Sequence, residues 1–345
     1  MRYPTAWLLL ASGVFGCVAH AQLAIKKVSE PAGKTLEKAL RESTLGQAGA
    51  KPFHVRLEVN QEEGTPGDYA ATIEETWATP DRWIRTVQAH DLSQLTVMNE
   101  SGLHVVTKGD YFPKWLRDFV TGLFTPVPNP NRWNLSKAPL EHIELPNGAR
   151  SSPCQHAEFE LGDPPLQQVN FATNCFQPND GLLEMAQSPN YTMEFKKYAA
   201  FGKLKIAREL LEEPGRRVHL TGRITVLEEA KAVGAQAFDT PANAEGTNSL
   251  SSALLSTTEL VSLAGGLPTL PWPNPIPGHG MFTVWLSIDR SGRVREAHSL
   301  NSDESGIAAD MSAQLVGRQW KPYVKDGLPV QSEGALVFAY PPEQH

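Results

Sequence analysis

The sequence predicts an α+β protein in which a long antiparallel sheet with a few helices is followed by a small β-β-α-β domain. Its 345 residues exceed the usual size of a single core, so two domains are the default expectation. The 27 glycines and 27 prolines favour a turn-rich, strand-rich fold over a helical bundle. Apolar Phe53, Val55, Leu57 and Val59 alternate with polar residues, as in a half-buried strand.

Residues 1–21 are expected to form a signal peptide. Arg2 precedes an apolar run over residues 6–19, and Ala19-His20-Ala21 provides an A-x-A cleavage site. The run is shorter than the roughly 20 apolar residues of a transmembrane helix. We therefore expect a periplasmic protein. An uncleaved inner-membrane anchor and a lipoprotein are alternatives, the second because the sequence VFGC at 14–17 partly resembles a lipobox.

Export determines how the cysteines are interpreted. Cys17 would leave with the signal peptide, and Cys154 and Cys175 would remain as a pair. In an oxidising compartment such a pair predicts a disulfide, which stabilises by roughly 3 kcal/mol when it closes a loop of this size.

Residues 22–240 are expected to form the first domain. Its pattern predicts an opening helix, a series of strands, a second helix and a further series of strands, which together make an antiparallel sheet long enough to curl. The expected helices span residues 31–44 and 111–124, and the expected strands span residues 53–59, 69–77, 83–87, 95–98, 103–107, 170–176, 182–187, 191–198, 204–211 and 217–227.

Residues 241–270 are expected to be a linker, because the composition shifts to Ala, Asn, Ser and Gly near its start. Such a linker predicts two domains that move independently. Residues 271–345 form the second domain, with strands expected at 282–288, 293–300 and 330–340 and a helix at 305–318.

The second domain resembles the C-terminal domain of the energy transducer TonB family. The resemblance runs through VWLSIDRSGRV at 284–294, GIAAD at 306–310, QWKP at 319–322, DGLPV at 326–330 and VFAY at 337–340. It implies transport across the envelope and binding of envelope proteins or outer-membrane receptor peptides by strand addition to an exposed edge. The implied edge strand consists of Val330, Gln331, Ser332, Glu333, Gly334, Ala335, Leu336, Val337, Phe338 and Ala339. The alternative is that the first domain or a second subunit covers this edge.

The chain departs from that family at its N-terminus. It has no long Pro-Glu/Pro-Lys spacer, and Ser12 and His20 do not reproduce the pattern of the family's membrane helix. A membrane-anchored energy transducer is therefore an alternative function, not the main expectation.

The first domain resembles, more weakly, the LolA/LppX lipoprotein-binding group. The opening helix, TW at 76–77, PDRW at 80–83 and the long antiparallel continuation carry this resemblance. It implies an incomplete barrel with an apolar cavity for a lipid or a lipoprotein acyl chain. The large rings that would line it are Trp77, Trp83, Trp115, Phe119 and Trp133. The alternative is that these rings fill an ordinary core.

No sequence motif indicates catalysis. The chain contains no G-x-S-x-G, H-E-x-x-H or calcium-loop spacing, and no cofactor or metal is expected. The net charge of -7 gives no basic footprint for nucleic acid. We therefore expect a non-catalytic protein. An enzyme whose site is assembled only by folding is the alternative.

Overall fold

The computed structural model describes residues 26–31, 34–47, 49–63, 68–127, 138–144, 151–161, 167–188, 191–215, 218–230, 234–244, 252–271, 280–300 and 307–340. The predicted signal peptide and Trp133 lie outside these ranges. None of the described helices is long and apolar enough to cross a membrane.

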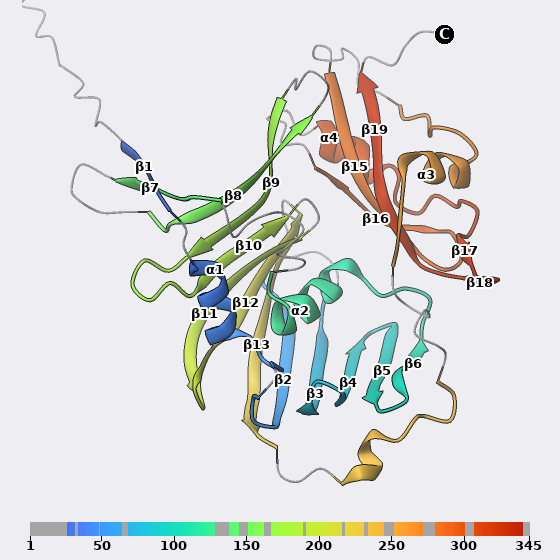
Figure 1. Cartoon of the computed structure of the whole chain (residues 1–345). Helices are drawn as coiled ribbons and strands as arrows, with labels where there is room; N and C mark the ends of the chain where they lie inside the picture. Colours follow the sequence, from blue (N-terminus) through green and yellow to red (C-terminus); the bar gives the residue numbers. More distant parts are fainter. Residues whose placement is uncertain are drawn as a thin grey trace, which may run out of the picture.

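A 13-stranded antiparallel sheet forms the first domain and curls around two helices without closing into a ring (Figure 1). The strand order is β1-β7-β8-β9-β10-β11-β12-β13-β2-β3-β4-β5-β6. The sheet thus consists of two meanders joined by pairing of β13 with β2, and β1 pairs with β7. The strands are β1 (Lys26–Glu30), β2 (Phe53–Gln61), β3 (Ala71–Thr79), β4 (Arg82–Ala89), β5 (Leu92–Asn99), β6 (Gly102–Lys108), β7 (Leu140–Glu144), β8 (Cys154–Leu161), β9 (Gln167–Phe176), β10 (Leu183–Ser188), β11 (Tyr191–Phe201), β12 (Leu204–Gly215) and β13 (Val218–Glu229). An open, curled antiparallel sheet with few helices is what the sequence predicts.

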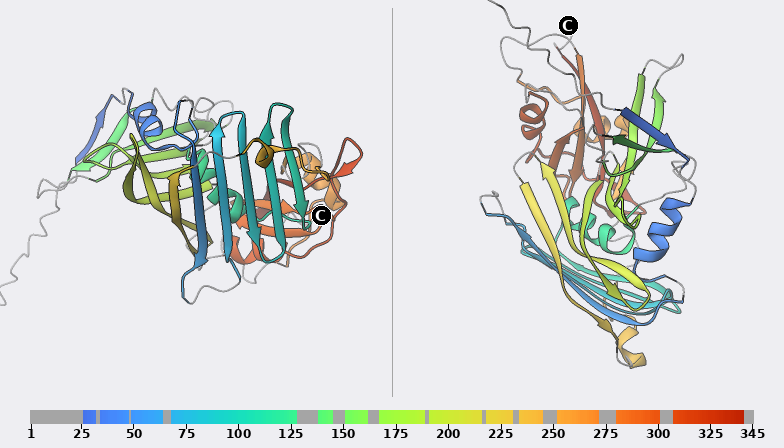
Figure 2. Two further views of the ribbon diagram at one scale, coloured as in Figure 1. Left: turned by 90° about the horizontal axis from the view of Figure 1, so that it is seen from below. Right: turned by 90° about the vertical axis from the view of Figure 1, so that its left-hand side faces the viewer.

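Helices α1 (Thr35–Ser43) and α2 (Lys114–Phe124) pack against the concave face of the sheet (Figure 2). The strand alternation supplies that face, since every second residue of β2 from Phe53 to Val59 is buried. Helix α2 buries Leu116 and Phe119 completely in the same core. A short 3-10 helix, η2 (Ala235–Phe238), lies beside β4 and β5.

The disulfide Cys154–Cys175 is confirmed and joins β8 to β9. The two cysteines are directly opposite each other in the antiparallel ladder.

The second domain contains a four-stranded sheet in the order β14-β19-β15-β16. Its elements are β14 (Ala253–Leu255), α3 (Thr257–Ala264), β15 (Gly280–Ile288), β16 (Val294–Ser299), α4 (Ile307–Ala313), the β17 (Val324–Lys325) and β18 (Leu328–Pro329) hairpin, and β19 (Ser332–Tyr340). The predicted β-β-α-β order corresponds to β15, β16, α4 and β19. Strand β14 and helix α3 lie inside the stretch expected to be linker, so the structure shortens that linker.

The two faces of this second sheet have different partners. Along β15, Val284, Leu286 and Ile288 point into the domain's own core. Ser287 lies between them on the strand and therefore on the other face, where the register places it beside Glu296 of β16 and Glu333 of β19. That second face packs against the first domain.

Three residues of the first domain, Phe112, Lys114 and Arg117, bind three residues of the second domain, and we call these contacts the seam. The backbone N–H of Phe112 donates to Gln331 Oε1 at 2.8 Å, and Gln331 Nε2 donates to the Phe112 carbonyl at 3.0 Å. The Lys114 N–H donates to Glu296 Oε1 at 3.0 Å, and Arg117 Nη2 donates to Glu333 Oε2 at 2.7 Å. The expectation of independent domains did not anticipate these contacts, in which buried and partly buried polar groups satisfy one another across the boundary.

Candidate functional site

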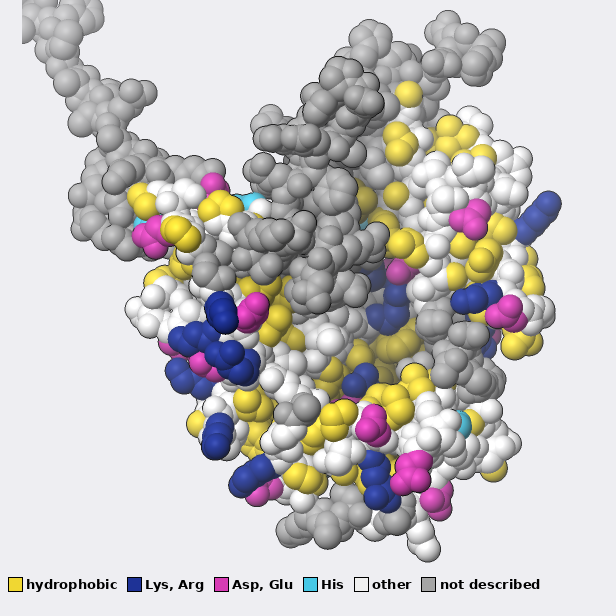
Figure 3. Space-filling model, viewed as in Figure 1, with side chains coloured by type: hydrophobic (Ala, Val, Ile, Leu, Met, Phe, Trp, Pro, Cys, Tyr) yellow, Lys and Arg dark blue, Asp and Glu magenta, His cyan; other side chains and the backbone are white. Residues whose placement is uncertain are grey.

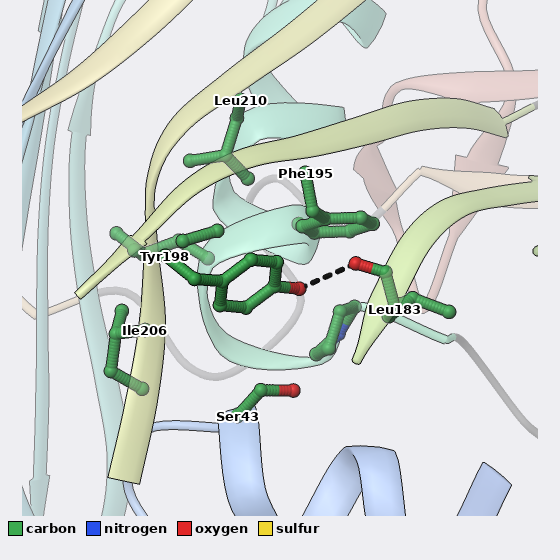
Figure 4. A pocket seen from close by; sticks show the side chains of 10 residues that line it. Ser43, Leu183, Phe195, Tyr198, Ile206 and Leu210 are labelled. Atoms are coloured by element: carbon green, nitrogen blue, oxygen red, sulfur yellow. Dashed lines mark hydrogen bonds between the residues drawn. The ribbon is translucent and has the colours of Figure 1, made fainter. Parts of the chain in front are cut away.

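A small apolar hollow lies between the two helices and the concave face of the first sheet (Figure 4). Helix α1 contributes its last residue, helix α2 contributes its C-terminal half, and β10, β11 and β12 form the opposite wall. The lining residues are Ser43, Gly122, Leu123, Pro126, Leu183, Phe195, Tyr198, Ile206, Ala207 and Leu210.

The two hydroxyl groups of the hollow are bonded to the protein itself. Tyr198 Oη donates to the Leu183 carbonyl at 2.6 Å, and Ser43 Oγ donates to the Ala39 carbonyl at 2.7 Å. Burial raises the pKa of the Tyr198 hydroxyl, which keeps it protonated and able to donate. A guest in this hollow would therefore meet hydrocarbon surface with few open hydrogen-bonding positions.

Local backbone features shape the hollow. Lys197 has a left-handed conformation, with φ at 55°, and the ladder between β11 and β12 lacks a pair at this residue. Phe195 and Tyr198 on either side of it both point into the hollow (Figure 4). On the facing wall, a Cβ added to Gly122 would lie 3.0 Å from side-chain atoms of Leu210 and Met193, so glycine permits the close approach of α2.

The hollow is narrow. The space free of atoms within it is about 290 Å³, part of which opens to solvent. The part that a water molecule can occupy is about 10 Å³, which is close to the least that holds one water. A larger guest requires the walls to move apart, and Met193 beside Gly122 is a side chain that adapts readily to such a change.

A buried ionisable cluster lies on α2 one turn before the hollow. The Lys114 ammonium forms an ion pair with Asp118, and Glu212 of β12 shares a hydrogen bond with Asp118. Burial and then the negative charge of Asp118 raise the pKa of Glu212 well above its usual value, so Glu212 holds the shared proton. Among the residues that the structure describes, no group of three or more His, Cys, Asp or Glu side chains is placed to hold a metal ion.

The aromatic residues predicted to line a cavity do not line this hollow. Trp77 stacks on Phe53 with 5.4 Å between ring centroids, and Trp115 meets Tyr69 edge to face at the same separation. Phe119 is completely buried in the core, and Trp83 is partly buried at its margin. These four rings are part of the core or pack against it, as the alternative interpretation expected. Trp133 lies outside the described residues.

The residues that do line the hollow were missed, although their strands were predicted. The pattern at 191–198 and 204–211 indicates buried strand faces. The sequence pattern of a buried face is the same whether that face packs against side chains or lines a cavity. The separation between the walls depends on how closely α2 approaches the sheet and on the distortion at Lys197, and neither of these two features has a signal in the sequence.

The predicted edge strand is only partly an edge. Ser332, Glu333 and Gly334 pair in parallel with β14, so the prediction is corrected for these three residues. Val330 and Gln331 are buried before the strand starts, and Gln331 takes part in the seam. From Ala335 to Ala339, β19 extends beyond the end of β14 and pairs with β15 on its other side. Val337 in this part is 41% exposed.

The surface between the two domains has a mixed character. In the space-filling view, hydrophobic side chains line the recess between the second domain and the first sheet, and Lys and Arg side chains stand among them (Figure 3). A separate shallow depression on the first sheet, near Asn60, Thr72 and Gln88, is lined mainly by polar and small residues.

Comparison with known proteins finds similarity to solved structures only. No family model and no curated protein matches the chain. A LolA superfamily protein from Nitrosomonas europaea is similar over 60% of this chain and 96% of its own, with 8% identity and a TM-score of 0.27. A putative outer membrane lipoprotein-sorting protein domain from Vibrio parahaemolyticus is similar over 60% of this chain and 95% of its own, with 9% identity and a TM-score of 0.30. Values this low do not define a function, and the resemblance to TonB stays a prediction.

Proposed function

We propose that the protein is an exported, non-catalytic binding protein of the bacterial envelope that holds one apolar chain, such as the acyl chain of a lipid or lipoprotein, in the hollow. The apolar lining carries this proposal. Eight of its ten residues have no polar side-chain atom, and the other two are Ser43 and Tyr198. Ligand sites are mostly apolar concavities of roughly 300–1,000 Å³. The hollow shares their apolar lining, but only about 10 Å³ of it is open to a water molecule, so it must widen to reach that size.

The internal bonds of Tyr198 and Ser43 favour a hydrocarbon guest over a polar one. A polar ligand would have to break these bonds or remain unpaired, which costs about 1–3 kcal/mol per buried group. An alkyl chain incurs no such cost and gains roughly 0.8 kcal/mol for each CH₂ that leaves water. The same absence of open polar groups gives the hollow no group to act as nucleophile or base.

Native mass spectrometry of the protein purified from bacterial cells tests the proposal. We expect a fraction with an additional mass of one lipid or fatty acid, which disappears on denaturation. Ala207→Leu fills the hollow from β12 and should reduce the bound fraction at least several-fold. Ala200→Leu places the same side chain on an exposed position of β11 and should leave it unchanged.

Thermal unfolding of both variants shows whether they are folded, because overpacking a core costs about 1–3 kcal/mol. An apo mass in every preparation, or a bound species that Ala207→Leu retains, would rule out this use of the hollow.

A second candidate function is partner binding by strand addition at β19. The observation that favours it is the stretch from Leu336 to Ala339, which continues past β14 and carries the exposed Val337. It begins just after Ala335, whose carbonyl accepts a hydrogen bond from the Thr257 hydroxyl. An extended peptide could continue the sheet there through its backbone hydrogen bonds.

A photo-crosslinking amino acid at position 337 tests this candidate in cells. We expect a crosslinked envelope protein that is absent when the crosslinker replaces Glu74 of β3 in the other domain. Identical crosslinks from both positions would argue against strand addition.

A further inference from the structure

Helix α2 belongs to both the hollow and the seam. We propose that it couples them, so that a ligand entering the hollow loosens the docking of the second domain, and loosened docking opens the hollow. This coupling rests on the proposed function for its ligand, whereas its structural half concerns α2 and the seam alone.

The first step is that α2 has no cap of its own. Its N-cap residue is Pro113, which makes no side-chain cap, and its first turn contains no acidic residue. The N-terminus of a helix leaves N–H groups without partners and favours negative charge. Glu296 of the second domain provides an acceptor and a negative charge, since its carboxylate accepts the hydrogen bond of the Lys114 N–H.

The second step is that further contacts hold the same end of the helix. The Arg117–Glu333 ion pair lies one turn along α2, with side chains only 20% and 13% exposed. The Gln331 amide, which is completely buried, completes the hydrogen bonding of Phe112 just before the helix. Largely buried pairs of this kind resist partial separation of the two domains. A partner that loses its hydrogen bond while it is still shielded from water pays the full cost of desolvation.

The third step is that the other end of α2 forms a wall of the hollow. Gly122 and Leu123 line it, about 12 Å along the helix from Lys114 at the usual rise per residue. The hollow has room for about one water, so an alkyl chain enters only if the walls move apart, and α2 is one of these walls. A helix of eleven residues moves largely as one body, and its movement pulls on the seam.

The direction of the coupling follows. The seam holds α2 against Leu210 and Met193 and so stabilises the closed hollow. Binding of an apolar ligand favours the open position and therefore weakens the seam. By thermodynamic linkage, weakening the seam must strengthen ligand binding by the same factor.

The test uses the full chain, hydrogen exchange, and a fluorescent fatty acid as probe. In Glu296→Ala and Glu333→Ala, we expect the amides of α2 to exchange about 2- to 30-fold faster, the range that loss of an N-cap produces. The affinity for the probe should rise by about 5- to 150-fold, the usual size of coupling between sites. Adding the probe to the natural protein should accelerate exchange in the peptide that contains Gln331 and Glu333.

Glu74→Ala is the control, because it breaks the His54–Glu74 contact on the opposite face of the sheet. Glu296→Gln keeps the side-chain volume and should give a smaller change of the same sign if Glu296→Ala does not fold. The coupling would be overturned if the seam variants bind the probe with unchanged affinity and the amides of α2 exchange at an unchanged rate. That result would leave the proposed function standing. If the probe binds no variant, the proposed function fails, and unchanged α2 exchange would then overturn the coupling independently.

Discussion

Two buried acids near Lys114 respond to pH in opposite directions. Burial would raise the pKa of Glu296, but the hydrogen bond and the charge of His298, together with the hydrogen bond from the Lys114 N–H, outweigh it and lower the pKa to about 2. For Glu212, burial and the charge of Asp118 both raise the pKa. Glu296 therefore adds stability above its unfolded pKa of 4.5, and this stability is lost as the pH falls toward 2. Glu212 adds stability below 4.5, and this stability is lost as the pH rises through its raised pKa.

Glu212→Gln should isolate the second response. Glutamine is neutral at every pH and its amide can still donate to Asp118, so the variant avoids deprotonation of a buried acid. We expect the free energy of unfolding of the natural protein to fall relative to the variant between pH 5 and pH 8. Urea unfolding at several pH values measures this difference. Glu100→Gln, at an exposed position between β5 and β6, is the control. Curves for Glu212→Gln and the natural protein that run parallel would contradict the assignment.

At the scale of elements, the seating of α2 on the sheet depends on a glycine of β13. A Cβ at Gly222 would lie 2.8 Å from ring atoms of Phe119, which is closer than packed atoms come. Gly222→Ala should therefore lower the free energy of unfolding by about 1–3 kcal/mol through overpacking. Gly234→Ala is a matched control, because nothing lies within 4 Å of its added Cβ. Chemical denaturation measures both, and equal stabilities would show that α2 can shift without cost.

The regular elements were the part of the fold that the sequence predicts well. The alternation through Phe53 and Val59 is β2, the turn at Asp289 and Gly292 joins β15 to β16, and the aromatic stretch after Tyr111 contains α2. Each of these signals lies within the element itself or at its end, which is why a single sequence is sufficient to find it.

Strands β1, β7 and β8 were not expected from the sequence, and the other missed parts depend on distant residues. Strand β14 has three residues and exists because it meets Ser332–Gly334, far along the chain. Helix α3 did leave a local signal, since Ser256 and Glu259 form a capping box, but the surrounding composition was interpreted as linker. The hollow and the seam have no local signal, because both are defined by the space between elements.

At the scale of the whole molecule, the seam predicts that the two domains move as one body. Gln331→Ala would leave the N–H and carbonyl of Phe112 without partners, at about 1–3 kcal/mol for each buried group. We expect a larger radius of gyration by small-angle X-ray scattering. Gln319→Ala is the control, since Gln319 binds the Ser291 carbonyl within the second domain. An unchanged radius in Gln331→Ala would mean that other contacts suffice to hold the domains together.

The pairing of β13 with β2 also has a consequence for how fast the chain folds. Each meander is built from neighbouring hairpins, which form within about 1–10 μs once their residues are available. The first meander emerges early in synthesis, but one side of β2 has no partner until β13 has been made. Joining of the two meanders thus waits for the last strand of the domain. It also has the entropic cost of closing a very long loop between β2 and β13. During that interval the open side of β2 is where the nascent chain is most exposed to aggregation, and where a chaperone would act to greatest effect.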